Sequence, residues 1–180
     1  MTKRKVFLAL ALLTMSSWLF AQDLDRPAGF SVVLGPRIGG GYIFQTSAAF
    51  TASLRDFYPT GDYFPAMTLF GITVEERILL GNTRSHFAFQ EIVLVGGLEQ
   101  GIAMPEGAIL IGYRDYSGLE VGIGPILHPA GFGVVAAVGW TFSYKGVHVP
   151  VDIGFTIPNA ERPALLSLTT GFNFEILRRE

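Results

Sequence analysis

The stretch that decides the fold is 131–144, which reads GFGVVAAVGWTFSY. Within it every second residue from Phe132 onward is large and apolar, apart from Ala136, and most residues between them are small. The stretches 147–157 (VHVPVDIGFTI) and 166–176 (LSLTTGFNFEI) alternate in the same way. Because successive side chains of a β-strand point to opposite faces, the pattern predicts three consecutive strands, each with one apolar face and one small or polar face.

Five earlier segments show the same alternation and complete a set of eight predicted strands. Turn residues bound them, and the chain has no internal repeat and no linker, so a single all-β domain is expected. The five predicted strands are 29–44, 63–79, 86–99, 108–115 and 118–126.

The third predicted strand changes phase in its middle. Phe87 and Phe89 lie on one face of an ideal strand, whereas Ile92 and Leu94 lie on the other. If every large apolar side chain points to the same side of the sheet, an extra residue must separate the two pairs. The sequence therefore predicts a β-bulge near Gln90–Glu91.

The predicted strands are joined by short and long connections in alternation. Glycine and asparagine, which tolerate positive φ, occur in the short ones at 81–82, 115–118 and 145–146. The longer ones are 45–62, 100–106, 127–130 and 158–163. Together with the even strand number, this arrangement predicts an eight-stranded antiparallel up-and-down transmembrane β-barrel whose short turns face the periplasm.

The distribution of polarity indicates which face of the sheet is the interior. One face of the predicted strands is almost continuously apolar, while charged residues, glycine, serine and threonine occupy the other. A soluble barrel hides its apolar side chains inside, but in a membrane the apolar face must contact lipid and the charged face must line the lumen. We therefore expect a lumen charge network of Arg37, Glu75, Arg77, Arg114, Glu120, Asp152 and Glu175.

Aromatic side chains gather near both ends of the predicted strands. Aromatic rings concentrate at the two membrane–water interfaces of outer-membrane barrels, so their positions support the same orientation. The predicted aromatic girdles contain Phe30, Tyr42, Phe44, Tyr113, Phe132, Trp140, Phe142, Tyr144, Phe172 and Phe174.

The N-terminus has the layout of a secretory signal peptide. Basic residues at 3–5 precede an apolar run, and Ala21 is a small residue at the expected cleavage site. The alternative is a retained anchor, but the 16 residues from Val6 to that alanine are fewer than the roughly 20 that a spanning helix needs. We therefore expect a signal peptide at 1–21 and a barrel domain at 22–180, located in the cell outer membrane.

The composition argues against several classes of function. Without the predicted signal peptide the chain has 10 basic and 15 acidic residues, a balance that disfavours binding to nucleic acid. Cysteine is absent, so the chain has neither disulfides nor thiol chemistry. His86, His128 and His148 lack the spacing of metal ligands, and neither a metal nor a cofactor is expected.

Lipid-modifying enzymes exist on barrels of this size, but the sequence does not predict one here. Such an enzyme needs a nucleophile such as serine, a histidine within hydrogen-bond reach and an acid that orients the histidine. His128 has no outward serine beside it, and His86 has only Ser85 and Glu91 as candidate partners. We therefore predict that the protein is not an enzyme.

Two features of the predicted barrel leave alternatives open. Because eight strands enclose an interior just wide enough for side chains, the lumen charges are expected to form a buried ion-pair network, with a narrow polar conduit as the alternative. The loop 45–62 carries Phe50, Leu54, Phe57 and Tyr58 among small polar residues. It is expected either to bind a small hydrophobic ligand or a surface partner, or to form a passive cap.

The whole chain after the predicted signal peptide resembles the small eight-stranded outer-membrane proteins of diderm bacteria, the OmpX, OmpW and OmpA-barrel group. The resemblance lies in the signal peptide, the strand number, the inverted polarity and the aromatic girdles. Beyond Ile176 the chain departs from the group, because residues 177–180 follow the last alternating positions where such barrels usually end in an aromatic residue.

The resemblance implies contacts with outer-membrane lipids and with the barrel-assembly machinery. It also implies a porin-like, non-enzymatic role in envelope integrity, in surface interaction or in the passage of small hydrophobic molecules. The alternatives are a lipid-modifying barrel enzyme and a soluble periplasmic ligand-binding barrel.

Overall fold

The computed structural model describes most of the chain after residue 28. The signal peptide predicted at 1–21 lies outside the described residues, as do the start of the domain predicted at 22–180 and most of the loop 45–62. The described residues are 29–44, 50–52, 55, 64–80, 85–129, 131–145, 147–159 and 162–179.

Strands make up most of the described chain. A short 3-10 helix, η1 (Leu98–Gln100), lies between the third and fourth of them. The strands are β1 (Phe30–Ile43), β2 (Ala66–Leu79), β3 (His86–Gly96), β4 (Met104–Arg114), β5 (Leu119–His128), β6 (Gly131–Tyr144), β7 (Val147–Ile157), β8 (Leu165–Gly171) and β9 (Asn173–Arg179).

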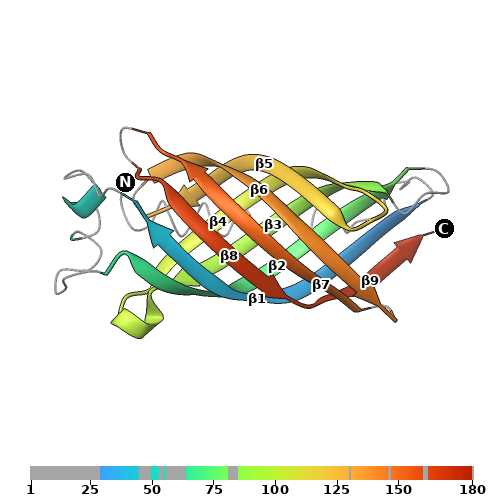
Figure 1. Cartoon of the computed structure of the whole chain (residues 1–180), viewed down its shortest axis with the longest axis horizontal. Helices are drawn as coiled ribbons and strands as arrows, with labels where there is room; N and C mark the ends of the chain where they lie inside the picture. Colours follow the sequence, from blue (N-terminus) through green and yellow to red (C-terminus); the bar gives the residue numbers. More distant parts are fainter. Residues whose placement is uncertain are drawn as a thin grey trace.

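The strands form one closed antiparallel sheet. Strands adjacent in the chain pair with each other from β1–β2 to β7–β8, and β1 also pairs with β8 and β9, which closes the sheet. Because β8 and β9 are two parts of one strand interrupted at Phe172, the barrel has eight strands. Figure 1 shows these strands crossing the long axis of the molecule at a marked tilt, as closure of a small barrel requires. The predicted all-β, eight-stranded antiparallel up-and-down closed barrel is confirmed.

The eighth strand is longer than the segment 166–176 that the sequence predicted. It runs from Leu165 to Arg179 with the interruption at Phe172, and its last residues pair with the start of β1 as far as Phe30. The residues beyond the predicted end are therefore part of the sheet, because the first strand is long enough to pair with them.

The β-bulge predicted near Gln90–Glu91 is wrong. β3 pairs with both β2 and β4 without any shift in register from His86 to Gly96. The alternation is kept, so that Ile92 and Leu94 face the interior. The prediction failed because it assumed that all large apolar side chains point outward, whereas part of this interior is apolar.

The fourth strand was also predicted too short, at 108–115. It begins at Met104, so that the predicted loop 100–106 contributes residues to the strand and the connection shrinks to η1 and its neighbours. Gly97 and Gly101 flank η1 with φ angles of 79° and 70°, which glycine adopts without steric cost.

The connections distinguish the two ends of the barrel. One end, called here the turn end, holds the turn 115–118 and is where β1 begins and β9 finishes. The opposite end, the loop end, holds η1 and the connection between β7 and β8 (Figure 1). The connection predicted at 127–130 proves short, since β5 and β6 are separated only by residues 129–130.

The interior has two halves of opposite character. The polar half, next to the turn end, contains the buried charged residues Glu75, Arg77, Arg114 and Glu120. The apolar half, next to the loop end, is filled by two clusters of buried hydrophobic side chains, so the expectation of a charged or small-residue interior holds only for the polar half. The clusters are Ile43, Phe50, Met67, Leu69, Leu94, Ile102, Met104 and Leu165, and Ala108, Leu110, Ile126 and Val135.

The outer face of the sheet exposes large apolar side chains on every strand of the barrel. Ile123 of β5 is 55% exposed, Phe142 of β6 59% and Leu168 of β8 55%. Two carboxylates interrupt this apolar face. In the strand register Glu76 lies opposite Phe89, and Glu91 follows Phe89 by two residues on the same face of β3. No helix among the described residues is both long and apolar enough to cross a membrane.

Candidate functional site

The seven residues predicted as a lumen charge network all occupy positions in register with the interior face. The structure brings most of them together in the polar half and leaves Glu175 apart, 3.8 Å from Arg178 near the turn end. Asp152 is partly buried. The remaining five are buried: Arg37, Glu75, Arg77, Arg114 and Glu120.

Glu75 is the centre of the network and has no exposed surface. Its Oε1 accepts a hydrogen bond from Arg77 Nε at 2.7 Å and lies 3.4 Å from His86 Nε2. Its Oε2 accepts one from Arg114 Nη2 at 3.0 Å. A buried carboxylate is stable only when such donors replace its lost hydration, and three strands supply them here.

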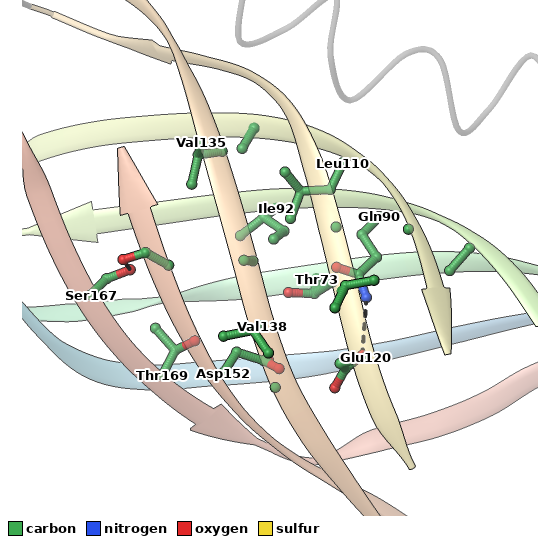
Figure 2. Close-up of a pocket in the computed structure, with 18 of the residues that line it drawn as sticks. Thr73, Gln90, Ile92, Leu110, Glu120, Val135, Val138, Asp152, Ser167 and Thr169 are labelled. Atoms are coloured by element: carbon green, nitrogen blue, oxygen red, sulfur yellow. Dashed lines mark hydrogen bonds between the residues drawn. The ribbon is translucent and has the colours of Figure 1, made fainter. Parts of the chain in front are cut away.

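Glu120 forms the second carboxylate of the network. Arg114 donates to its Oε2 from Nε at 3.0 Å and also from Nη2. Thr141 Oγ1 donates to Oε1 at 2.8 Å. Gln90 Nε2 lies 3.5 Å from both Glu75 and Glu120, and Figure 2 shows its bond to Glu120 at the border between the two halves. One arginine and one glutamine thus connect two carboxylates from different strands.

Arg37 and Asp152 lie on the other wall of the barrel. Arg37 Nη1 donates to Asn173 Oδ1 at 2.6 Å, and the asparagine is fully buried. Asp152 points into the lumen beside the backbone of Gly139, where a Cβ atom would come within 2.0 Å of the Asp152 carboxylate. A side chain at this position would therefore displace the carboxylate and crowd the carbonyl oxygen of Val151, 2.8 Å from the same Cβ position.

A second buried ion pair, which the sequence did not predict, lies in the apolar half. Arg162 Nη2 donates to Glu106 Oε2 at 2.7 Å, and both side chains are almost fully buried. His128 is buried near this pair and stacks on Phe50 with ring centroids 6.1 Å apart. The signal that was missed is the alternation of β4, since Glu106 shares the phase of Leu110 and lies on the interior face.

The cavities differ in size between the two halves. A cavity of about 70 Å³ lies in the middle of the lumen, between Val135 and Leu110 on one side and Asp152 and Thr169 on the other (Figure 2). A cavity of about 20 Å³ lies beneath Phe50 at the loop end. At the turn end, a far larger cavity of about 780 Å³, called here the vestibule, extends from the charge network.

The vestibule contains a serine–histidine pair that the sequence analysis did not identify. Ser143 Oγ and His148 Nδ1 are 2.7 Å apart on neighbouring strands and face the lumen. Among the described residues, no hydrogen bond links an acid to this histidine, and no group of three metal-ligating side chains occurs. Period-two alternation places both residues on the inner face. The pair was missed because only serines on the outer face were considered as nucleophiles.

Outside the strands, two carboxylates cap local structure. Glu99 of η1 accepts a hydrogen bond from the backbone N of Thr68 at 3.0 Å and another from its hydroxyl, which lowers the pKa of Glu99 to about 2. In the turn between β4 and β5, Asp115 accepts hydrogen bonds from Ser117 Oγ and from the backbone N of Ser117 and Leu119. The pKa of Asp115 is lowered mainly by the hydroxyl bond.

The residues of the predicted aromatic girdles occupy outward positions. Phe30 differs from the others in its exposure. Its register matches the outer face, but its side chain is only 7% exposed. Tyr42 and Phe44 contact each other edge to face at the loop end, with ring centroids 5.0 Å apart. The exposed residues are Tyr42, Phe44, Tyr113, Phe132, Trp140, Phe142, Tyr144, Phe172 and Phe174.

No protein-family model matches this chain, and no curated protein matches it.

Proposed function

We propose that the protein is a non-enzymatic integral outer-membrane β-barrel, exported with residues 1–21 as its signal peptide. The observation that carries the proposal is the inverted polarity of the closed sheet. Large apolar side chains such as Ile123 and Leu168 are more than half exposed outside, while Glu75 and Arg114 are buried inside. Soluble monomers rarely expose continuous apolar surface, because water disfavours it, but a bilayer requires such a surface.

Closure of the sheet supports the same proposal. Every strand has two hydrogen-bonded neighbours, so that no strand edge is left open along the barrel. In hydrocarbon an unpaired backbone group has no water to bind and costs several kcal/mol. A soluble ligand carrier is less well supported, because such a barrel hides its large apolar side chains from water, whereas Ile123 and Leu168 are more than half exposed here.

The filled lumen favours a structural or surface role over passage of molecules. Phe50 is 1% exposed and packs in the apolar half, and the ion pair between Glu106 and Arg162 lies beside it. Eight strands leave no spare width around such side chains. We propose that the barrel does not conduct and serves envelope integrity or surface interaction, as in the OmpX, OmpW and OmpA-barrel group that it resembles.

The test is folding into lipid vesicles, followed by electrophoresis of unheated and heated samples. A folded barrel in the membrane should migrate differently before and after heating. Ile123→Lys should greatly reduce the folded fraction, because lysine on the lipid face near the bilayer centre costs about 2–4 kcal/mol. Tyr116→Lys is the matched control: it adds the same charge at a turn residue that is 77% exposed and should fold normally.

Two outcomes would contradict the proposal. A chain that stays folded and monomeric in buffer without detergent or lipid would exclude the membrane assignment. Steady conductance across a planar bilayer after verified insertion would exclude the closed lumen, which predicts a silent membrane.

A further inference from the structure

We propose that the vestibule at the turn end binds an oxyanion, the phosphate or carboxylate group of a small molecule. The vestibule has a volume of about 780 Å³, which is within the range of small-molecule sites. The inference goes beyond the proposed function and does not depend on membrane insertion, because the barrel strands, the turn 115–118 and Lys145 form the cavity.

The first observation is a buried donor without a partner. Arg77 lines the vestibule, and its side chain is only 6% exposed. Its Nε is bound to Glu75, but its Nη2 is buried and has no hydrogen-bond partner among the described residues. Buried polar atoms are nearly always paired in folded proteins, so an orphaned guanidinium nitrogen indicates a place for an acceptor that binds from outside the chain.

The second observation is that the nearby carboxylates already have donors. Glu75 and Glu120, at the inner end of the vestibule, accept the bonds of the charge network described above. Asp115 accepts three bonds from its own turn. Glu175 lies 3.8 Å from Arg178. These carboxylates thus have contacts of their own, and none of them supplies the acceptor that Arg77 Nη2 lacks.

The third observation is a cation at the rim. Lys145 lines the vestibule and lies over the ring of Tyr144, 5.2 Å from the centroid. It has no carboxylate partner within salt-bridge distance among the residues that the structure describes. The hydroxyl of Ser31 lines the same cavity and adds a short, neutral donor, whereas the hydroxyl of Ser143 is already bonded to His148 Nδ1. Charge-assisted hydrogen bonds from arginine and lysine are the strongest that a phosphate or carboxylate can accept in a protein.

The experiment is calorimetric titration of the chain without its predicted signal peptide, folded in octyl glucoside, which carries neither phosphate nor carboxylate. Inorganic phosphate should bind saturably with a Kd in roughly the millimolar range, acetate should compete, and methylammonium should not bind. Arg77→Gln should weaken phosphate binding about tenfold, the effect of losing one charge-assisted hydrogen bond. Lys145→Ala should weaken it about twofold to threefold, as expected for an exposed charge.

The matched control is Arg55→Ala, which removes one exposed positive charge far from the vestibule lining and should leave phosphate affinity unchanged. If Arg77→Gln does not fold, the phosphate affinity of Lys145→Ala, compared with that of Arg55→Ala, shows whether phosphate binding depends on the vestibule or only on the total charge. No saturable phosphate binding by the folded chain would overturn the site, as would equal loss in the Lys145 and Arg55 variants. Heat-modifiable migration of the same sample shows that the barrel is folded, so either failure leaves the membrane proposal untouched.

Discussion

The two halves of the interior occupy the same cylinder of sheet but are stabilised in different ways. In the polar half, Glu75 and Glu120 share Arg114, which lies on a different strand from either carboxylate. In the apolar half, stability comes from filling volume with side chains such as Leu110, which is 2% exposed. The comparison teaches that removing one group should cost more where the group's partners are charged, because those partners remain buried and unpaired.

The halves also differ in what they leave open. A cavity of about 20 Å³ lies in the apolar half and one of about 70 Å³ in the middle of the lumen, whereas the polar half widens into the vestibule of about 780 Å³. Hydrophobic side chains pack closely and can fill the interior of the apolar half with few gaps. The open end of the barrel is the polar one.

The largest effect is expected from Glu75→Gln in the polar half. The amide keeps the shape but removes the charge that compensates Arg77 and Arg114, so the barrel should lose about 3–5 kcal/mol of unfolding free energy. Urea unfolding of the barrel in lipid vesicles measures it. Glu175→Gln, which removes a partly exposed carboxylate with a partner 3.8 Å away, should cost less than about 1 kcal/mol. Equal losses of unfolding free energy in the two variants would contradict the claim that the buried charge network contributes more stability than a partly exposed ion pair.

In the apolar half, Leu110→Ala should cost about 3 kcal/mol, because it loses the transfer free energy of the side chain and leaves a cavity. Ile111→Ala, on the outer face and 58% exposed, keeps the transfer cost but leaves no cavity, since lipid fills the space. It should cost about 1–2 kcal/mol. Urea unfolding of both variants in vesicles checks the order, and a larger loss for the outer variant would contradict the assignment of the interior.

A smaller effect is expected from Thr141→Val, which keeps the side-chain shape and removes the bond of 2.8 Å to Glu120. A hydrogen bond to a buried charged group contributes about 2 kcal/mol. Thr170→Val removes a bond of equal length to the carbonyl of Pro150 from the outer face and should cost about 1 kcal/mol. The difference between the two variants measures the charge on Glu120, and its absence in unfolding curves would argue that Glu120 is neutral.

The smallest effect concerns the loop end, outside both halves. Glu99 has its pKa lowered to about 2 by the bonds from Thr68, below the ordinary value of 4.5. A carboxylate with a lowered folded-state pKa stabilises the fold above the ordinary value, and this contribution is lost as pH falls from there toward 2. The amide NMR signal of Thr68 in the folded protein should shift with a midpoint near pH 2 and not between pH 5 and 7. Glu99→Gln should abolish the shift, and a midpoint near 4.5 would show that the cap is not formed.

How much the sequence predicted depends on the range of the interaction. Alternation from Phe132 to Tyr144 sets which side of the sheet each residue faces, because this is a local property of the extended chain. The structure keeps the alternation in β3 as well, where the predicted bulge had wrongly placed Ile92 and Leu94 on the outer face. The inward position of Glu106 was missed since Pro105 and Gly107 weaken the pattern of β4 and the segment was interpreted as a loop.

Contacts across the barrel could not be predicted from the alternation of residues along each strand. Arg114 reaches Glu75, 39 residues earlier, and Arg162 reaches Glu106, 56 residues earlier. Such pairs depend on the register of every strand between them and on the stagger that closes the sheet, neither of which is encoded in any one segment. The Ser143–His148 pair, only five residues apart, was accessible from the hairpin register but was not sought on the inner face.

The sequence by itself determined the class of the fold, the number of strands and the alternation of faces along a strand, because a strand has a period of two wherever it lies. Only the tertiary structure decided that the interior is split into an apolar and a polar half, that Ile92 belongs inside, and that the vestibule retains a free donor on Arg77. The reason is that depth along the barrel axis is fixed by strand register and closure, and these join residues that are distant in the chain.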